Sequence, residues 1–306
     1  MLIAIVISVV SLAVLLFASD WFINSAEKIG LSFGISPFII GVTIVAFGTS
    51  LPELATSIAS VFEGASEIVA GNVVGSNITN VLLVLGMTAI VGKEIKLDFN
   101  IWDIDMPLLI GSAILLFFCL QDQNLSGFEC ILLLVALVGF LINSVRGSRS
   151  DTDNKESVGF TDYFKLLLGG ILVYLGAQWT IFGIIQLSEI AGYHTEVVSQ
   201  TFVALGTSLP EVVVSLAAVR RGKHAIAVGN VLGSNIFNTY AVMAIPGLMG
   251  DLLIKDIIMD FSLPFMMGVT LLFGVMTISK RITFWEGILL ISLYGFFLVE
   301  SINSLS

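Results

Sequence analysis

Charged residues are scarce in this sequence of 306 residues. Asp, Glu, Lys and Arg together make up 12% of it, about half the share found in an average soluble domain. The mean hydropathy is +1.02, and charge-poor apolar runs of about 20 residues recur along the chain. These runs exclude a soluble domain, and they do not alternate as the strands of a transmembrane β-barrel would. The composition therefore predicts an all-α polytopic membrane protein.

Cysteine and histidine are also rare, with two residues of each. Cys119 and Cys130 flank a polar hairpin, where we expect two free thiols, with a disulfide as the alternative. His194 and His224 fall in predicted loops and are expected to be solvated. No Cys/His cluster has the spacing of a metal site. We expect no cofactor, no nucleic-acid partner and no obligate protein partner.

Ten membrane-spanning helices account for the apolar runs, if the first is a retained span. The first run lacks the basic start and the small-residue cleavage site of a signal peptide. The hydrophilic segment 147–159 divides the chain into two five-helix halves, residues 1–146 and 160–306. The predicted spans cover residues 2–28, 36–61, 67–91, 105–120, 127–146, 161–187, 196–219, 224–249, 261–279 and 284–302.

The distribution of Lys and Arg predicts the orientation in the cell membrane. With the N-terminus outside, twelve of the 13 basic residues fall in cytoplasmic loops and Lys255 alone falls outside. Because basic loops stay in the cytoplasm, both termini are predicted outside, with the 147–159 loop in the cytoplasm. The outer loops are rich in Asp and Glu, which would either concentrate cations near the entrance or simply form a solvated surface.

One motif of 15 residues occurs twice. Residues 43–57 read TIVAFGTSLPELATS and residues 201–215 read TFVALGTSLPEVVVS, so Glu53 and Glu211 lie 158 positions apart. Each copy lies within an apolar run long enough to cross a bilayer. Ionisable residues inside a membrane are costly, and they are interpreted as functional by default.

A second motif repeats with the same offset. GNVVGSNITN at 71–80 superimposes on GNVLGSNIFN at 229–238 without a gap, which indicates an internal duplication. Because each half has an odd number of spans, the two copies must cross the membrane in opposite senses. Inverted repeats of this kind are typical of secondary transporters, whose binding site lies near the midplane.

The two motifs gather oxygen atoms. Pro52 and Pro210 interrupt helical hydrogen bonding, so the carbonyls of Ala46, Phe47, Ala204 and Leu205 are expected to lose a helical partner. Neutral side-chain oxygens are added by the second motif, in Ser76, Asn77, Asn80, Ser234, Asn235 and Asn238. Two carboxylates with neutral oxygens suit hard cations such as Ca²⁺, Na⁺, Mg²⁺ or Mn²⁺. Anions are disfavoured, because no Lys or Arg lies within a span near either motif.

Some of these polar residues also have a structural interpretation. Ser and Thr often bond their own helix, and Asn often joins helices in membranes. That interpretation stays open for the asparagines of the second motif, namely Asn72, Asn77, Asn230 and Asn235. Asp20, which has Gln178 at the equivalent position, is expected to be structural or to lie near an interface.

GTSLPE paired with GNxxGSN in both halves resembles the α-repeats of the cation/Ca²⁺ exchanger superfamily, specifically its prokaryotic sodium/calcium exchanger branch. The resemblance covers the whole chain. It implies that Glu53 and Glu211 bridge all the ion sites. It further implies ligands from the hydroxyls of Thr49, Ser50, Thr207, Ser208, Ser76 and Ser234, the amides of Asn80 and Asn238, and the carbonyls of Ala46 and Ala204.

The resemblance implies a Na⁺/Ca²⁺ antiporter rather than an enzyme. Potassium-dependent members carry Asp where this chain has Asn238, so potassium cotransport is disfavoured. Exchange of three Na⁺ for one Ca²⁺ is expected, by alternating access in which spans one and six slide against a fixed core. A proton/Ca²⁺ antiporter on the same scaffold is the alternative, because buried carboxylates can also carry protons. An intramembrane protease is disfavoured, because the chain lacks the Gly-x-Gly-Asp pattern. A passive channel is also disfavoured, because it would not need broken inverted repeats.

Overall fold

The computed structural model is helical apart from one two-stranded ribbon. It describes residues 2–97, 101–103, 105–146, 158–190 and 207–303. Strands β1 (Glu94–Lys96) and β2 (Arg281–Thr283) pair antiparallel. The α-helices are α1 (Leu2–Ser32), α2 (Pro37–Ile40), α3 (Ala46–Thr49), α4 (Leu51–Phe62), α5 (Glu67–Thr79), α6 (Gly86–Gly92), α7 (Asp105–Cys119), α8 (Gly127–Arg146), α9 (Phe160–Ile190), α11 (Leu209–Arg220), α12 (His224–Phe237), α13 (Met243–Met249), α14 (Leu263–Thr277) and α15 (Phe284–Asn303).

Seven helical stretches among the described residues are long and apolar enough to cross a membrane. They cover residues 3–32, 37–62, 67–92, 127–144, 160–183, 258–277 and 284–301. A shorter apolar helix covers 105–119, where another span was predicted. The predicted span 224–249 is observed as helix but is less apolar, because three Asn side chains interrupt it. Of the predicted span 196–219, residues 196–206 lie outside the described residues.

Four π-helical segments interrupt these helices: η1 (Gly41–Val45), η2 (Asn80–Leu85), η3 (Asn238–Val242) and η4 (Ile258–Ser262). Asn80 is the first residue of η2 and Asn238 is the first residue of η3. Such bulges occur often at functional sites, because the wider turn redirects the side chains next to it. The two bulges begin 158 residues apart, which is the offset of the sequence repeat.

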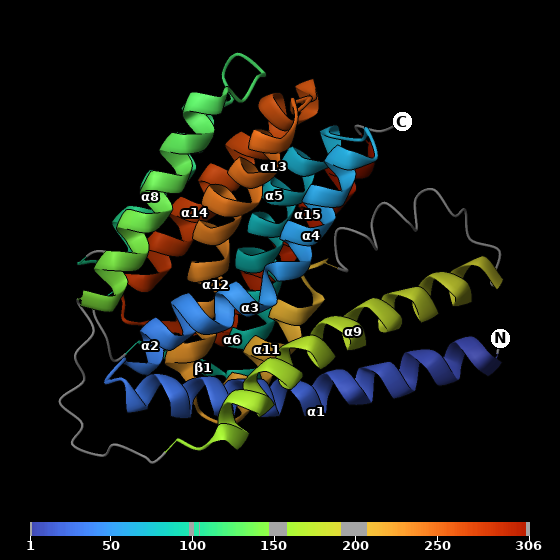
Figure 1. Cartoon of the computed structure of the whole chain (residues 1–306), viewed down its shortest axis with the longest axis vertical. Helices are drawn as coiled ribbons and strands as arrows, with labels where there is room; N and C mark the ends of the chain where they lie inside the picture. Colours follow the sequence, from blue (N-terminus) through green and yellow to red (C-terminus); the bar gives the residue numbers. More distant parts are fainter. Residues whose placement is uncertain (1, 98–100, 104, 147–157, 191–206, 304–306) are drawn as a thin grey trace.

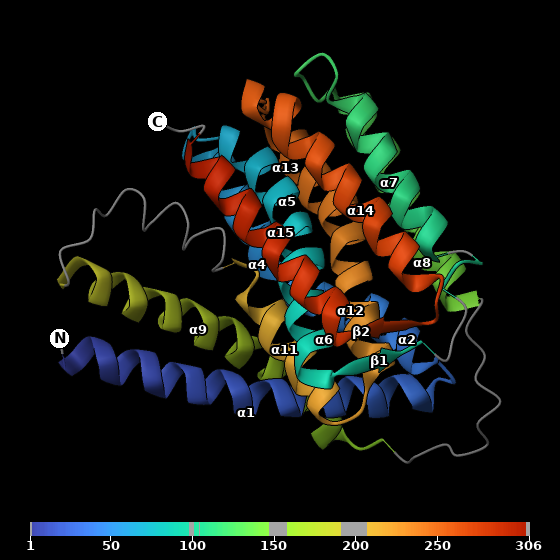
Figure 2. The ribbon, with the colours of Figure 1, turned by 180° about the vertical axis from the view of Figure 1, so that it is seen from behind.

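Helices α1 and α9 form a unit that lies across the rest of the bundle. They run side by side, while the other long helices stand steeply above them (Figures 1 and 2). Glycines at 169, 176 and 183 allow the close approach, since they recur every seven residues on one face. A Cβ at Gly176, for example, would lie 3.0 Å from the Leu15 backbone. Thr180 Oγ1 also donates to Ser11 Oγ at 2.9 Å.

Two buried clusters form the core. The larger one joins α5, α7, α12, α14 and their neighbours around side chains such as Leu82, Met106 and Phe273. The smaller one holds α1 and α9 against α11, with Leu15 and Ile23 fully buried. The crossing pair is therefore attached to the bundle through a separate and smaller cluster.

Ion pairs tie α1 to the loop after α11. Arg221 pairs with Asp20 at 2.7 Å and Lys223 pairs with Glu27 at 2.5 Å. Asp20 therefore has the structural contact that its position suggested. Cys119 and Cys130 are both buried and free, which confirms the expected thiols.

Candidate cation site

Each copy of the first motif breaks its helix at Ser. Ser50 has φ −90° and ψ 5°, Ser208 has φ −86° and ψ 3°, and neither pair is helical. A new helix then begins with Pro in its first turn, where its missing N–H costs no hydrogen bond. Glu53 and Glu211 follow in the first turns of α4 and α11, where the positive end of the helix dipole favours a carboxylate.

The break does not free the carbonyl of Ala46. This oxygen accepts the N–H of Ser50 at 3.0 Å and the hydroxyl of Thr49 at 3.3 Å. The expectation that Ala46 loses its helical partner is therefore wrong. An α-helical bond joins residue i to i−4, so the missing N–H of Pro52 is the one that would reach Gly48. The role of Ala46 as an ion ligand stays a prediction, and Ala204 lies outside the described residues.

The two carboxylates meet in the interior. Glu53 and Glu211 are both 0% exposed, and they lie close enough to repel each other electrostatically. Among the described residues, Asp105 is the one other buried charged side chain, and none of the three is basic. Two carboxylates buried without a protein cation are strongly unfavourable, which makes the centre a place for external cations or protons.

The polar atoms around the carboxylates are largely without partners. Among the described residues, all but one of the buried side-chain atoms that lack a hydrogen bond belong to the two motifs. The exception is Ser144. Buried polar groups are normally satisfied, so such a cluster of bare oxygens fits bound ions. The atoms are both carboxylate oxygens of Glu53, Oε2 of Glu211, Oγ of Ser76 and Ser208, Oδ1 of Asn77 and Asn235, and both amide atoms of Asn80 and Asn238.

Hydroxyl groups from the first copy face the carboxylate of the second. Ser50 Oγ donates to Glu211 Oε1 at 3.1 Å, and Thr49 and Ser234 also lie beside Glu211. The hydroxyls of Thr49 and Ser234 are 3.4 Å apart. The structure thus brings these four predicted residues together across the two halves of the chain.

Further hydrogen bonds cross between the halves in matched pairs. Thr49 Oγ1 donates to Asn230 Oδ1 at 3.1 Å, and Thr207 Oγ1 donates to Asn72 Oδ1 at 3.4 Å. The two bonds are related by the 158-residue offset. The sequence leaves the role of Asn72 and Asn230 open, because a motif does not show which side chain an amide contacts. The structure assigns both their partners.

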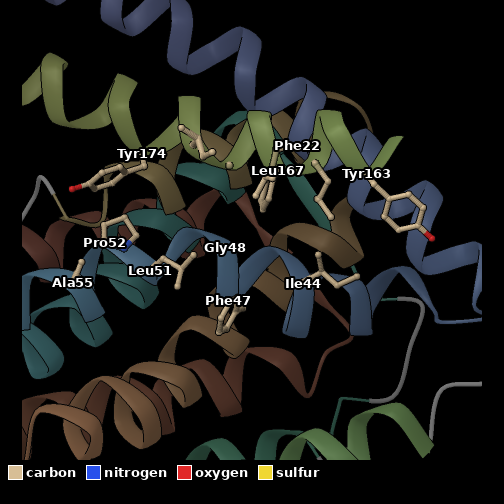
Figure 3. A pocket seen from close by; sticks show the side chains of 13 residues that line it. Phe22, Ile44, Phe47, Gly48, Leu51, Pro52, Ala55, Tyr163, Leu167 and Tyr174 are labelled. Atoms are coloured by element: carbon tan, nitrogen blue, oxygen red, sulfur yellow. The ribbon is translucent and has the colours of Figure 1, made fainter. Parts of the chain in front are cut away.

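An apolar pocket lies on the opposite side of the same broken helix. It has a volume of about 460 Å³ and is lined by α9, Phe22 of α1 and the motif helix. In Figure 3, Leu167 and Tyr174 of α9 face Phe47, Leu51 and Ala55 of the motif helix. Its lining carries no carboxylate or amide side chain, so this pocket is unsuited to ions. The hydroxyls and Glu53 point the other way, into the bundle.

Comparison with known proteins agrees with this arrangement. The chain is 34% identical to the sodium/calcium exchanger MaX1 of Methanosarcina acetivorans, with 96% of this chain and 97% of that protein covered. Over 43% of this chain it is 33% identical to the sodium/potassium/calcium exchanger 2 of Rattus norvegicus, covering 20% of that protein. A solved structure of the sodium-calcium exchanger NCX_Mj superimposes with a TM-score of 0.83 at 29% identity, covering 100% of this chain and 99% of that one.

Fold and site together define a polytopic helical membrane protein with a buried, oxygen-rich acidic centre. The model of the sodium/calcium exchanger protein family matches residues 3–146 and 162–303. The chain belongs to this family of membrane exchangers.

Proposed function

We propose that the protein is a secondary active antiporter that exchanges Na⁺ for Ca²⁺ across the membrane. The observation that carries the proposal is the buried pair Glu53 and Glu211, which lacks a protein cation and is surrounded by unpartnered neutral oxygens. Hard oxygen ligands of this kind suit Ca²⁺ and Na⁺. The proposed ligands are the predicted set, with Glu53 and Glu211 shared by all bound ions.

The charge of the site sets the electrical balance. Two carboxylates are neutralised by one Ca²⁺, whereas three Na⁺ leave the site with one net positive charge. An exchange of three Na⁺ for one Ca²⁺ therefore moves net charge. Each elementary charge gains about 2.3 kcal/mol per 100 mV of membrane potential, so the membrane potential would help to drive Ca²⁺ transport.

Potassium has no part in the proposed cycle. Asn80 and Asn238 occupy equivalent positions at the starts of η2 and η3. Both are amides, so the centre has two formal negative charges and not three. Such a site balances one Ca²⁺ without a further monovalent cation.

Alternating access is proposed to come from the α1 and α9 pair. These helices pack against each other across the steep bundle (Figures 1 and 2), and a separate core cluster connects them to it. We propose that they slide against the motif helices, which stay fixed. The cycle assumes ten spans in two inverted repeats, with both termini outside and the 147–159 linker in the cytoplasm.

The test uses the purified protein in proteoliposomes. An outward Na⁺ gradient at constant pH should drive uptake of ⁴⁵Ca²⁺, whereas a pH gradient without Na⁺ should not. When three Na⁺ leave for each Ca²⁺ that enters, one net positive charge leaves the vesicle, so uptake should rise when the interior is made positive and fall when it is made negative. The membrane potential is set with K⁺ and valinomycin. Uptake driven by the pH gradient alone would favour proton/Ca²⁺ exchange, and flux without any counter-ion gradient would indicate a channel.

A further inference from the structure

Two asparagines of the second motif are fully engaged by the protein. Asn230 Nδ2 donates to Ser215 Oγ at 3.0 Å. Asn72 Nδ2 makes the equivalent bond to Ser57 Oγ at 3.0 Å and also donates to the Glu53 carbonyl at 3.1 Å. Each amide is thereby anchored within its own half of the chain, with its oxygen turned towards the other half.

The anchored oxygens accept hydroxyl hydrogens from the opposite copy of the first motif. Asn230 Oδ1 accepts from Thr49 at 3.1 Å, and Asn72 Oδ1 accepts from Thr207 at 3.4 Å. Both threonines are proposed ion ligands. Each one is therefore paired with an asparagine of the other half.

A hydroxyl can bind a cation only through its oxygen lone pairs, because its single hydrogen must point elsewhere. The Glu211 carboxylate lies beside Thr49, and three other oxygen neighbours could take the hydrogen. These are Asn230 Oδ1 at 3.1 Å, the Ala46 carbonyl at 3.3 Å and Ser234 Oγ at 3.4 Å. Ala46, Ser234 and Glu211 are themselves proposed ligands, whereas Asn230 is not. The hydrogen bond to Asn230 is the shortest of these three, and Asn230 takes the hydrogen without occupying a ligand oxygen.

We propose that Asn230 and Asn72 are positioning residues that hold the hydrogens of Thr49 and Thr207 away from the ions. The inference rests on the proposed function, since it gives the threonines their role as ligands. The amides would not touch the ions. They would convert each threonine into a fixed acceptor, and because each bond crosses between the halves, they would also keep the two motif copies in register.

Other asparagines of the same motif provide the contrast. Asn80 and Asn238 have no hydrogen-bond partner for either amide atom, although both are 0% exposed. Their oxygens are free for direct binding. The motif GNxxGSNxxN thus combines an anchored amide at its start with a bare amide at its end.

The inference is tested with double-mutant cycles in the proteoliposome assay, with the KM for Ca²⁺ and the half-saturating Na⁺ concentration as readouts. Asn230→Ala should raise the KM for Ca²⁺ by about three- to tenfold, the range expected for one lost buried hydrogen bond. If Asn230 acts through Thr49, the double variant with Thr49→Val should be no worse than Thr49→Val alone. Thr49→Ser keeps the hydroxyl and should stay sensitive to Asn230→Ala.

The chain supplies its own matched control. Asn230→Ala combined with Thr207→Val joins two residues that do not bond each other, so the two fold-changes should multiply. The mirror cycle should show Asn72→Ala coupled to Thr207→Val and independent of Thr49→Val. Because Asn72 is less buried than Asn230, the mirror cycle keeps the test decisive if Asn230→Ala does not fold.

The inference would be overturned if the fold-changes in KM multiplied in the hydrogen-bonded pairs as they do in the unbonded control pairs. The asparagines would then have a structural role only. Failure of the proposed function is a separate result. It would appear as absence of Na⁺-dependent flux in the unmutated protein, before any variant is compared. The same cycles would then be read from equilibrium binding of Ca²⁺ to the purified protein by calorimetry.

Discussion

The broken helix that carries Glu53 has two faces of opposite character. On one face, Thr49, Ser50 and Glu53 are all 0% exposed. On the other, Phe47 is 51% exposed and Leu51 is 43% exposed, and both line the apolar pocket. A helix at the surface of a soluble protein would place these residues the other way round.

The difference shows what each face is built to contact. Apolar side chains facing a bilayer need no partner, so the outer face tolerates an open pocket. A buried carboxylate must be matched by charge or by hydrogen bonds, yet both oxygens of Glu53 lack a hydrogen-bond partner. The inner face therefore depends on bound ions, and substitutions on the two faces should have very different consequences.

The largest effect is expected from Glu53→Gln and Glu211→Gln. Either change leaves one negative charge at the centre, so a bound Ca²⁺ would keep an uncompensated buried charge. Na⁺-dependent ⁴⁵Ca²⁺ flux in proteoliposomes should fall to background. Glu63→Gln is the matched control, because Glu63 caps the same helix α4 but is exposed. Normal flux from either buried-site variant would disprove the site assignment.

A smaller effect is expected when a neutral ligand is removed. Asn80→Ala or Asn238→Ala should raise the KM for Ca²⁺ about tenfold, which corresponds to about 1.4 kcal/mol of binding free energy. The two variants should resemble each other because the residues hold equivalent positions. Asn124→Ala, in an exposed loop, serves as the control. An unchanged KM in both would show that these amides do not contact the ion.

Ser50→Ala should weaken binding less than the loss of an amide ligand. The change removes the hydroxyl that donates to Glu211 at 3.1 Å. We expect the half-saturating Na⁺ concentration to rise about three- to fivefold, which lies within the range of about 0.5–1.5 kcal/mol for the net effect of one hydrogen bond. Ser60→Ala removes a hydroxyl of α4 that bonds Thr56 within the helix. Equal effects of the two substitutions would contradict a special role for Ser50.

The smallest effect is expected on the outer face. Ala55→Leu adds apolar volume to a pocket of about 460 Å³, where the side chain has room. The KM for Ca²⁺ should stay within about twofold of the unmutated protein, in line with ordinary surface substitutions. The same flux assay measures it. A large change in KM would show that the two faces are coupled, and the contrast between them would no longer hold.

The sequence predicted more of this protein than is usual, because its signals are local. Apolar runs indicate helices wherever they occur, and the helices at 37–62, 67–92 and 284–303 lie within two residues of their predicted bounds. Glu53 and Glu211 stood out because carboxylates within apolar runs are rare. The error at Ala46 came from the assumption that Pro52 disturbs the backbone as far back as Ala46, whereas the Ala46 carbonyl still accepts the N–H of Ser50.

The amino-acid sequence by itself determined the class of protein, the repeat and the acidic pair, since composition, spacing and charge are properties of the chain. The tertiary structure decided which amides are anchored and which are bare. Asn72 and Asn80 are eight residues apart in one helical stretch, yet one has its partners and the other has none. That distinction depends on which side chains from the other half of the chain come within hydrogen-bonding distance, and only folding brings them there.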